Sequence, residues 1–196
     1  MPGAIAMAQI SPSFQHEALN LIFRDRFTDT NGTSLANHTP EKNTATAGWS
    51  VAVGTATIDS NAADVGTATP DIAVVTLGVA NYTVRCLMTI NAGNRFGVIL
   101  RYASTTSFVF IEGSGDVNQL QLRTRDAVGY NTISQTTFTW SGAIQLVARL
   151  DGSSVSATVG GTTLTGTITE AQTAGGVGIW GWSGDTADWD DLEVWK

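Results

Sequence analysis

The chain is 196 residues long, which suits one domain with its own hydrophobic core. Hydrophobic residues make up 42% of it and charged residues only 14%, and this balance excludes a disordered, charge-rich chain. The formal net charge of −7, with ten Lys and Arg residues, argues against binding to nucleic acid, because affinity for phosphates comes mostly from those cations. No apolar run approaches the ~20 residues that span a bilayer, so no membrane insertion is expected.

The N-terminal residues 1–22 differ in composition from the rest, and we interpret them as an arm or edge segment. They begin MPGAIAMAQI, without a basic start or a long apolar stretch, so a signal peptide is not predicted. Residues 23–196 alternate short apolar runs with turn residues and contain no linker or internal repeat. They are predicted to form a single domain.

Turn signals divide residues 23–196 into short strands. Asn31-Gly32, Asp151-Gly152 and Gly160-Gly161 are pairs that favour tight turns. Between them lie alternating runs at 48–58, 75–90, 95–102, 107–113, 118–125, 143–150, 154–159, 162–169, 175–182 and 188–195. About a dozen strands and no long helix predict an all-β protein, a two-sheet antiparallel β-sandwich.

Three neighbouring runs in the middle of the chain predict a set of side chains that points outward from the sandwich. If Val98, Leu100 and Tyr102 point inward, Arg101 points outward. The same alternation turns the following side chains outward: Phe108, Phe110, Glu112, Gln121 and Arg123. Polar groups interleaved with rings can stack on sugars and bond to their hydroxyls. The alternative is a ladder of arginine and carboxylate pairs that stabilises only the sheet surface.

Trp180 and Trp182 stand two residues apart in a Gly-rich stretch, so they should point the same way. They could form a sugar platform, a protein contact or part of the core. The predicted glycan or partner surface therefore comprises Arg101, Phe110, Glu112, Gln121, Arg123, Trp180 and Trp182.

Three motifs together resemble a known family. The first is F-x-D-x-F at Phe23, followed by His38-x-Pro40 and Trp49; the second is GVILRY with QLQLRTR; the third is VGIWGW with DWDDLEVW. They resemble the concanavalin A-like lectin/glucanase (laminin-G-like) jelly rolls found in bacteriophage virion proteins. The resemblance implies two antiparallel sheets, one of them concave, with the first and last strands adjacent.

The same resemblance implies a location on the virion surface and binding partners for the protein. We expect a non-catalytic lectin-like protein on the virion surface, made in the host cytoplasm and bound to capsid or tail proteins. A host glycan as ligand and assembly into a homo-oligomer are further expectations. A purely structural coat component without any ligand is a third alternative.

An enzyme is the main rival interpretation, as a glycan hydrolase or lyase. Catalytic relatives resemble one another in an E-x-D-x-E strand that places two carboxylates on one face, and this chain has none. A non-standard pair could come only from Asp188, Asp191, Glu193 or Glu112. In a regular strand Asp191 and Glu193 would share a face with Trp189 and Trp195.

The sequence contains possible calcium ligands and one cysteine. The resemblance brings the chain ends together and with them six oxygen-bearing side chains suited to calcium: Asp25, Asp29, Asn31, Asp188, Asp190 and Asp191. An Asp-rich turn usually serves only its own backbone, so no cofactor and no metal ligand is predicted, and structural calcium stays an alternative. Cys86 is the only cysteine, which excludes an internal disulfide, and it is predicted to be buried.

Overall fold

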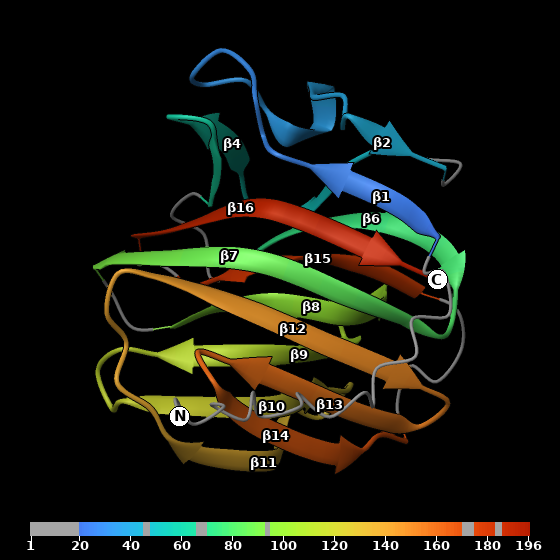
Figure 1. The fold of residues 1–196 in the computed structure, drawn as a ribbon, viewed down its shortest axis with the longest axis vertical. Helices are drawn as coiled ribbons and strands as arrows, with labels where there is room; N and C mark the ends of the chain where they lie inside the picture. Colours follow the sequence, from blue (N-terminus) through green and yellow to red (C-terminus); the bar gives the residue numbers. More distant parts are fainter. Residues whose placement is uncertain (1–19, 45–47, 66–69, 93–94, 170–174, 183–185) are drawn as a thin grey trace, which may run out of the picture.

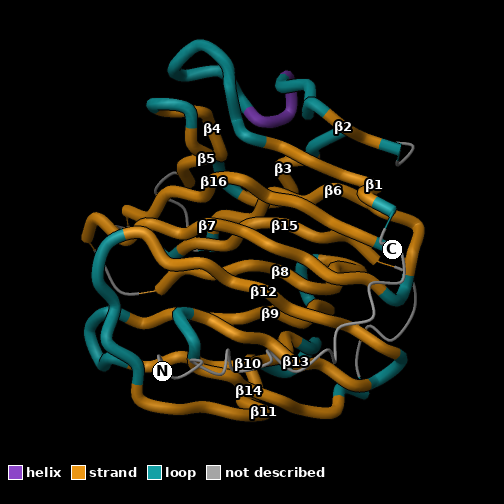
Figure 2. Tube along the Cα trace, viewed as in Figure 1, coloured by secondary structure: helices purple, strands orange, loops and turns teal. Residues whose placement is uncertain are grey.

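The computed structural model describes residues 20–44, 48–65, 70–92, 95–169, 175–182 and 186–196. These residues form two antiparallel β-sheets that pack face to face (Figure 1), and the predicted all-β sandwich is confirmed. Figure 2 shows how little of the described chain is helical: the helix is a single 3-10 turn, η1 (Leu35–Asn37). No described helix is long enough to cross a membrane.

Sheet A has nine strands, in the order β14-β13-β12-β7-β16-β1-β2, with β5 pairing to β16 and β4 to β5. Its strands are β1 (Leu21–Asp25), β2 (Lys42–Asn43), β4 (Ala56–Asp59), β5 (Ala62–Val65), β7 (Tyr82–Ala92), β12 (Ala143–Asp151), β13 (Ser154–Val159), β14 (Thr162–Thr167) and β16 (Thr186–Trp195).

Sheet B has seven strands, in the order β11-β10-β9-β8-β15-β6-β3. Its strands are β3 (Ser50–Val53), β6 (Asp71–Val79), β8 (Arg95–Ser104), β9 (Ser107–Ser114), β10 (Gln119–Arg125), β11 (Tyr130–Thr137) and β15 (Gly175–Gly181). The meander predicted for residues 95–125 is β8 to β10.

The first and last strands of the described chain lie side by side in sheet A (Figure 1). β1 pairs with β16, and Asn20 and Lys196 exchange backbone hydrogen bonds of 2.9 Å in both directions. Leu21 and Ile22, the last residues of the segment interpreted as an arm or edge segment, belong to β1. The rest of that predicted arm, residues 1–19, lies outside the described residues.

One hydrophobic core fills the space between the sheets. Sheet A contributes alternate residues of β7, and Val84, Cys86 and Met88 are all at most 1% exposed. Cys86 is buried as predicted, and burial raises the pKa of its thiol, which keeps the sulfur protonated and unreactive. Sheet B contributes residues such as Leu120 and Leu122 of β10, both fully buried.

A turn and a β-bulge each contradict a prediction from the strand pattern. The run 75–90 is two strands and not one, because the chain turns at Ala80–Asn81 between β6 and β7. In β16 the register shifts between Asp190 and Glu193, and Asp191 has a φ of 47°. This bulge reverses the alternation, so Trp189 enters the core with 0% exposure while Trp195 points the other way. The prediction that they share a face is wrong.

A buried carboxylate joins the motif residues of the N-terminal region. Asp25 is 0% exposed, and its Oδ2 accepts the indole N–H of Trp49 at 2.6 Å. Its Oδ1 accepts the backbone N–H of Phe27 at 2.7 Å and lies 2.9 Å from His38 Nε2. On the other side of the ring, His38 Nδ1 lies 3.2 Å from Asp29 Oδ2. These hydrogen bonds thus hold the segment between β1 and β3 against the end of β1.

The charges in this cluster depend on one another. Burial raises the pKa of Asp25, against the hydrogen bonds from Trp49, His38 and Phe27. Burial alone would lower the pKa of His38, but its hydrogen bonds to Asp25 and Asp29 outweigh burial and raise it. Because both ring nitrogens face carboxylate oxygens, the imidazole is held in its protonated form.

Replacing the buried carboxylate should therefore be costly. Asp25→Asn puts an N–H₂ group where only acceptors are needed, and we expect the free energy of unfolding to fall by about 3 kcal/mol. Urea denaturation followed by tryptophan fluorescence measures this. Asp29→Asn, on the partly exposed side of His38, is the matched control and should cost much less. Equal losses in the two variants would contradict the assignment of Asp25 as the anchor.

The raised pKa of His38 also predicts a pH dependence. The unfolded chain releases the His38 proton near pH 6.5, roughly the ordinary value, whereas the folded chain keeps it to a higher pH. The free energy of unfolding should therefore fall as the pH rises from about 6.5 through the folded pKa. Denaturation curves across this window measure the slope, and His38→Gln should flatten it. An unchanged slope in the variant would show that another group titrates.

Candidate functional site

The face of sheet B that points away from sheet A carries a second hydrophobic cluster, separate from the core. Its buried members are Ile72, Val74, Ile99, Phe108, Phe110 and Trp180, and its partly buried members are Ala52, Val53, Tyr102, Tyr130 and Trp182. We call this surface the aromatic face, after its six rings at Tyr102, Phe108, Phe110, Tyr130, Trp180 and Trp182.

Strand alternation and register build the aromatic face. In β9, Val109 and Ile111 enter the core, so Phe108, Phe110 and Glu112 point outward. The β10 residues that pair with those three are Arg125, Arg123 and Gln121, respectively. Directly paired residues lie on the same face of a sheet, so β10 adds two arginines and an amide beside the rings.

The rings of distant strands converge over β9. Tyr130 lies on β11 and Trp180 on β15, four strands away, which in a flat sheet is a separation of about 19 Å between backbones. Their ring centroids are nevertheless 6.4 Å apart. Tyr130 also lies 5.9 Å from Phe110 and 6.2 Å from Trp182. The phenylalanines are therefore fully buried, and Tyr130 and Trp182 are among the partly exposed rings.

Three arginines stand against these rings. The guanidinium carbon of Arg125 is 4.7 Å from the Tyr130 centroid, that of Arg123 is 5.2 Å from it, and that of Arg95 is 5.9 Å from the Trp182 centroid. Distances below about 6 Å are those of cation–π contacts. Each cation is therefore held beside a ring.

One carboxylate lies among the arginines. Glu112 is only 2% exposed, and its Oε2 accepts a 2.7 Å hydrogen bond from Arg123 Nη1. Its Oε1 lies 3.8 Å from Arg95 Nε. Removing either partner of such a pair would leave a charge in a poorly hydrated position, so the pair fixes the side chains around it.

The structure brings together six of the seven residues predicted for the surface. Phe110, Glu112, Gln121, Arg123, Trp180 and Trp182 all belong to the aromatic face or border it. Gln121 bonds to two neighbouring glutamine side chains, Gln119 and Gln135. Trp180 and Trp182 lie on the same side, as their spacing predicted, with ring centroids 5.9 Å apart.

Arg101 is the exception, and its predicted outward orientation is wrong. The β8 register shifts between Ile99 and Arg101, so Arg101 pairs with Val109 and enters the interior, with 0% exposure. There Nη2 donates to the carbonyl of Ala80 at 2.6 Å, and burial lowers the pKa of the guanidinium. The same bulge turns Tyr102 outward onto Phe108, where the prediction had placed it inward.

Sequence reasoning missed three residues of this face. Arg125 continues the outward alternation of Gln121 and Arg123, so the signal was present in the sequence. Tyr130 and Arg95 gave no such signal, because their approach to the other rings depends on how side chains lean across the folded sheet.

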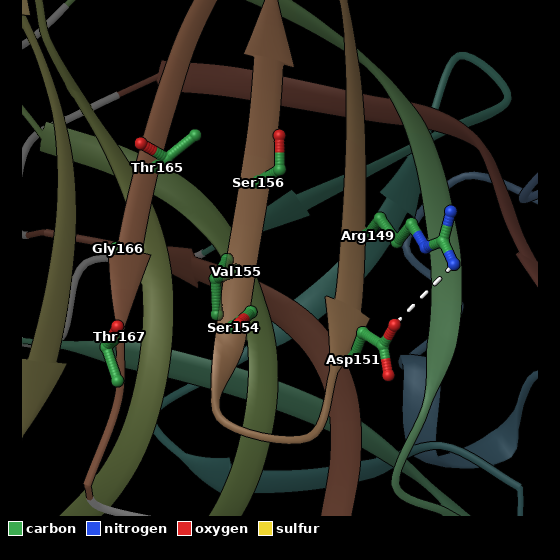
Figure 3. Close-up of a pocket in the computed structure, with 8 residues that line it drawn as sticks. All are labelled: Arg149, Asp151, Ser154, Val155, Ser156, Thr165, Gly166 and Thr167. Atoms are coloured by element: carbon green, nitrogen blue, oxygen red, sulfur yellow. Dashed lines mark ion pairs between the residues drawn. The ribbon is translucent and has the colours of Figure 1, made fainter.

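A different surface carries a shallow hollow of about 410 Å³ on sheet A, between β12, β13 and β14. Figure 3 shows its lining residues, Arg149, Asp151, Ser154, Val155, Ser156, Thr165, Gly166 and Thr167. The hydroxyl groups are short and exposed, and one ion pair, Arg149 to Asp151 at 3.6 Å, crosses the rim. It has no aromatic ring and no buried polar group, which makes it the weaker candidate for a ligand site.

The carboxylates considered for catalysis are dispersed. Glu112 is on the outer face of sheet B, whereas Glu193 is in sheet A, held by Arg24 at 2.8 Å and Arg85 at 2.9 Å. Asp188 pairs in register with Asp64 of β5. Burial, with the charge of Asp188, raises the pKa of Asp64. This is a like-charge pair that the sequence did not reveal.

Four of the six side chains considered for structural calcium have these other partners. Asp25 and Asp29 bind His38, and Asp191 lies 3.5 Å from Arg26. Asp190 Oδ1 accepts the backbone N–H of Asp191 at 2.7 Å. Across the part of the chain that the structure describes, no three His, Cys, Asp or Glu side chains gather as a metal-binding group.

Comparison with known proteins gives matches at the level of structure. No protein-family model matches the sequence, and no curated protein matches it. A carbohydrate-binding module, CBM66 from Bacillus subtilis, superposes with a TM-score of 0.68 at 10% identity, covering 76% of this chain and 95% of that one. A Bacillus subtilis protein of unknown function with a galectin-like fold gives 0.64 at 8% identity, covering 90% and 96%.

Two further structures extend the comparison. The exoplasmic/lumenal domain of VIP36, in a form bound to Ca²⁺ and Man3GlcNAc, gives a TM-score of 0.56 at 8% identity, covering 74% of this chain and 82% of that one. The GH43 protein BlXynB from Bacillus licheniformis gives 0.57 at 15% identity, but the match spans only 33% of its length. At these identities the likeness concerns the fold, and the chain has the jelly-roll β-sandwich fold that lectins and carbohydrate-binding modules share.

Proposed function

We propose that this protein is a non-catalytic glycan-binding module whose ligand lies on the aromatic face. The observation that carries the proposal is the pair of partly exposed rings, Tyr130 and Trp182, which meet edge to face at 6.2 Å with an arginine beside each. The apolar C–H faces of a sugar pack on such rings, and its hydroxyl groups bond to the polar groups at their edges.

The polar groups around the rings suit sugar hydroxyls. The guanidinium groups donate hydrogen bonds, and the side-chain amide of Gln121 can both donate and accept. Burial raises the pKa of Tyr130, so its phenol stays protonated and can donate as well. The rings and arginines also restrain one another through cation–π contacts, so little side-chain entropy is lost on binding.

The exposed tryptophan provides the direct test of this proposal. Trp182→Ala should weaken binding to a glycan found on an array by at least about tenfold, because it removes one of two stacking surfaces. Isothermal titration calorimetry measures the change. Trp195→Ala is the matched control, because Trp195 lies in sheet A, away from the aromatic face. It has a similar arginine contact: Arg85 lies 5.8 Å from the Trp195 ring, and Arg95 lies 5.9 Å from the Trp182 ring. Equal effects in the two variants would rule out the aromatic face as the site.

Binding without cleavage is the second part of the proposal. It is supported by the distribution of the candidate carboxylates over both sheets and by the engagement of Glu193 with two arginines. Incubation with the bound polysaccharide should release no new reducing ends. Release that is lost in Asp188→Asn would overturn this part and assign a catalytic role to the Asp64–Asp188 pair.

We also propose display on a bacteriophage particle, on the capsid or the tail. The support is the resemblance carried by residues 23–51, 97–102, 119–125, 177–182 and 188–195. Mass spectrometry of purified particles from the source of the gene tests this, and a chain found only outside the particles would contradict it.

A further inference from the structure

We propose that the glycan is acidic and that Arg125 binds its carboxylate, an inference that rests on the glycan-binding function proposed above. It names the chemical class of the ligand. Three observations support it, namely the charge of the aromatic face, the absence of an ion pair between Arg125 and any described residue, and the contact of Arg125 with Tyr130.

Positive charge is concentrated on the aromatic face of an acidic protein. The chain has ten Lys and Arg residues against seventeen Asp and Glu. Three of the ten cations, Arg95, Arg123 and Arg125, lie on this face, where they outnumber the anions Glu112 and Asp126. A net positive surface on a chain of charge −7 attracts an anionic ligand and raises its association rate.

Of these cations, Arg125 is the one available to a ligand. Arg123 is already paired with Glu112 at 2.7 Å, and Arg95 lies 3.8 Å from the same carboxylate. Arg125 stacks on Tyr130 and forms no ion pair with any residue that the structure describes. The next carboxylate along the chain, Asp126, is directed into its own turn, where it accepts the N–H groups of Val128 and Gly129 at 2.7 and 2.8 Å.

The turn after β10 fixes the position of Arg125. Besides those two N–H groups, Asp126 accepts a 2.7 Å hydrogen bond from the side chain of Asn131, and these bonds lower the pKa of its carboxyl. The N–H of Asp126 in turn donates to the carbonyl of Gly129 at 3.0 Å. The strands that carry Arg125 and Tyr130 are thereby joined by a well-bonded turn, which holds these two residues opposite one another in register.

The shape of the guanidinium favours a carboxylate. Its planar fork presents parallel N–H donors that match the two oxygens of a carboxylate. In Arg125 this fork forms no ion pair with a described residue. In a hexuronate the carboxylate projects from the rim of the sugar ring. A uronate ring packed against Trp182, beside the edge-to-face Tyr130 ring, can therefore extend its carboxylate toward Arg125.

The probes are three uronate polysaccharides, pectate, alginate and hyaluronan, each compared with its carboxyl-reduced neutral form by isothermal titration calorimetry. At least one acidic form should bind about tenfold more tightly than its neutral form, or better. Raising the salt from about 50 mM to about 500 mM should weaken only the acidic form. Arg125→Gln should reduce its affinity to the neutral level, and a thermal melt of the variant shows whether it is folded.

The matched control is Arg149→Gln, on the exposed edge of sheet A, which should change neither affinity. Equal or tighter binding of a neutral form, or an Arg125→Gln variant with unchanged affinity for the acidic form, would overturn this inference and leave the proposed function intact. Preference for a sulfated glycan over every uronate would overturn the carboxylate assignment. Absence of binding to any glycan, acidic or neutral, would refute the proposed function and the inference with it.

Discussion

Alternate residues of a β-strand point to opposite faces of its sheet. Only one of the two faces packs against the other sheet of a sandwich. Sheet B carries large apolar side chains on both faces. Val109 and Ile111 pack toward sheet A, while Phe108 and Phe110 point away from it. The outward rings can leave water only by covering one another, and they do so with the help of Tyr130 and Trp180. The position of the candidate site follows from this constraint.

Regular strands made much of the fold and of the aromatic face predictable. A period of two was enough to assign the inward residues of β7 and the outward positions of Phe110, Glu112 and Arg123. The glycine-containing turns at 151–152 and 160–161 separated β12, β13 and β14 correctly, because their backbone needs positive φ angles.

The errors came from single inserted residues and from contacts between distant segments. A bulge in β8 moved Arg101 into the interior, and a bulge in β16 separated Trp189 from Trp195. No pattern in the sequence announces such a bulge. The hydrogen bonds of Asp25 to Trp49 and His38 likewise depend on how the segment between β1 and β3 folds back against β1. The motif residues were visible, but their contacts arise only in three dimensions.

Two of the buried carboxylates, Asp25 and Glu112, illustrate different uses of charge. Asp25 is surrounded by N–H groups from three other residues and stabilises the backbone near β1. Glu112 lies under a face that we propose to be functional, and its bond to Arg123 restrains a cation next to two rings. Both depend on complete hydrogen bonding, because a buried charge that lacks partners destabilises a fold strongly.

The burial of Cys86 makes selective labelling of this protein practicable. The chain has only one native thiol, it is fully buried, and its raised pKa keeps it out of reach of alkylating reagents. Val128, at the tip of the turn after β10, is 96% exposed. A cysteine introduced there would be the sole reactive thiol, so a fluorophore could be attached beside Tyr130 without removing any native residue from the interior.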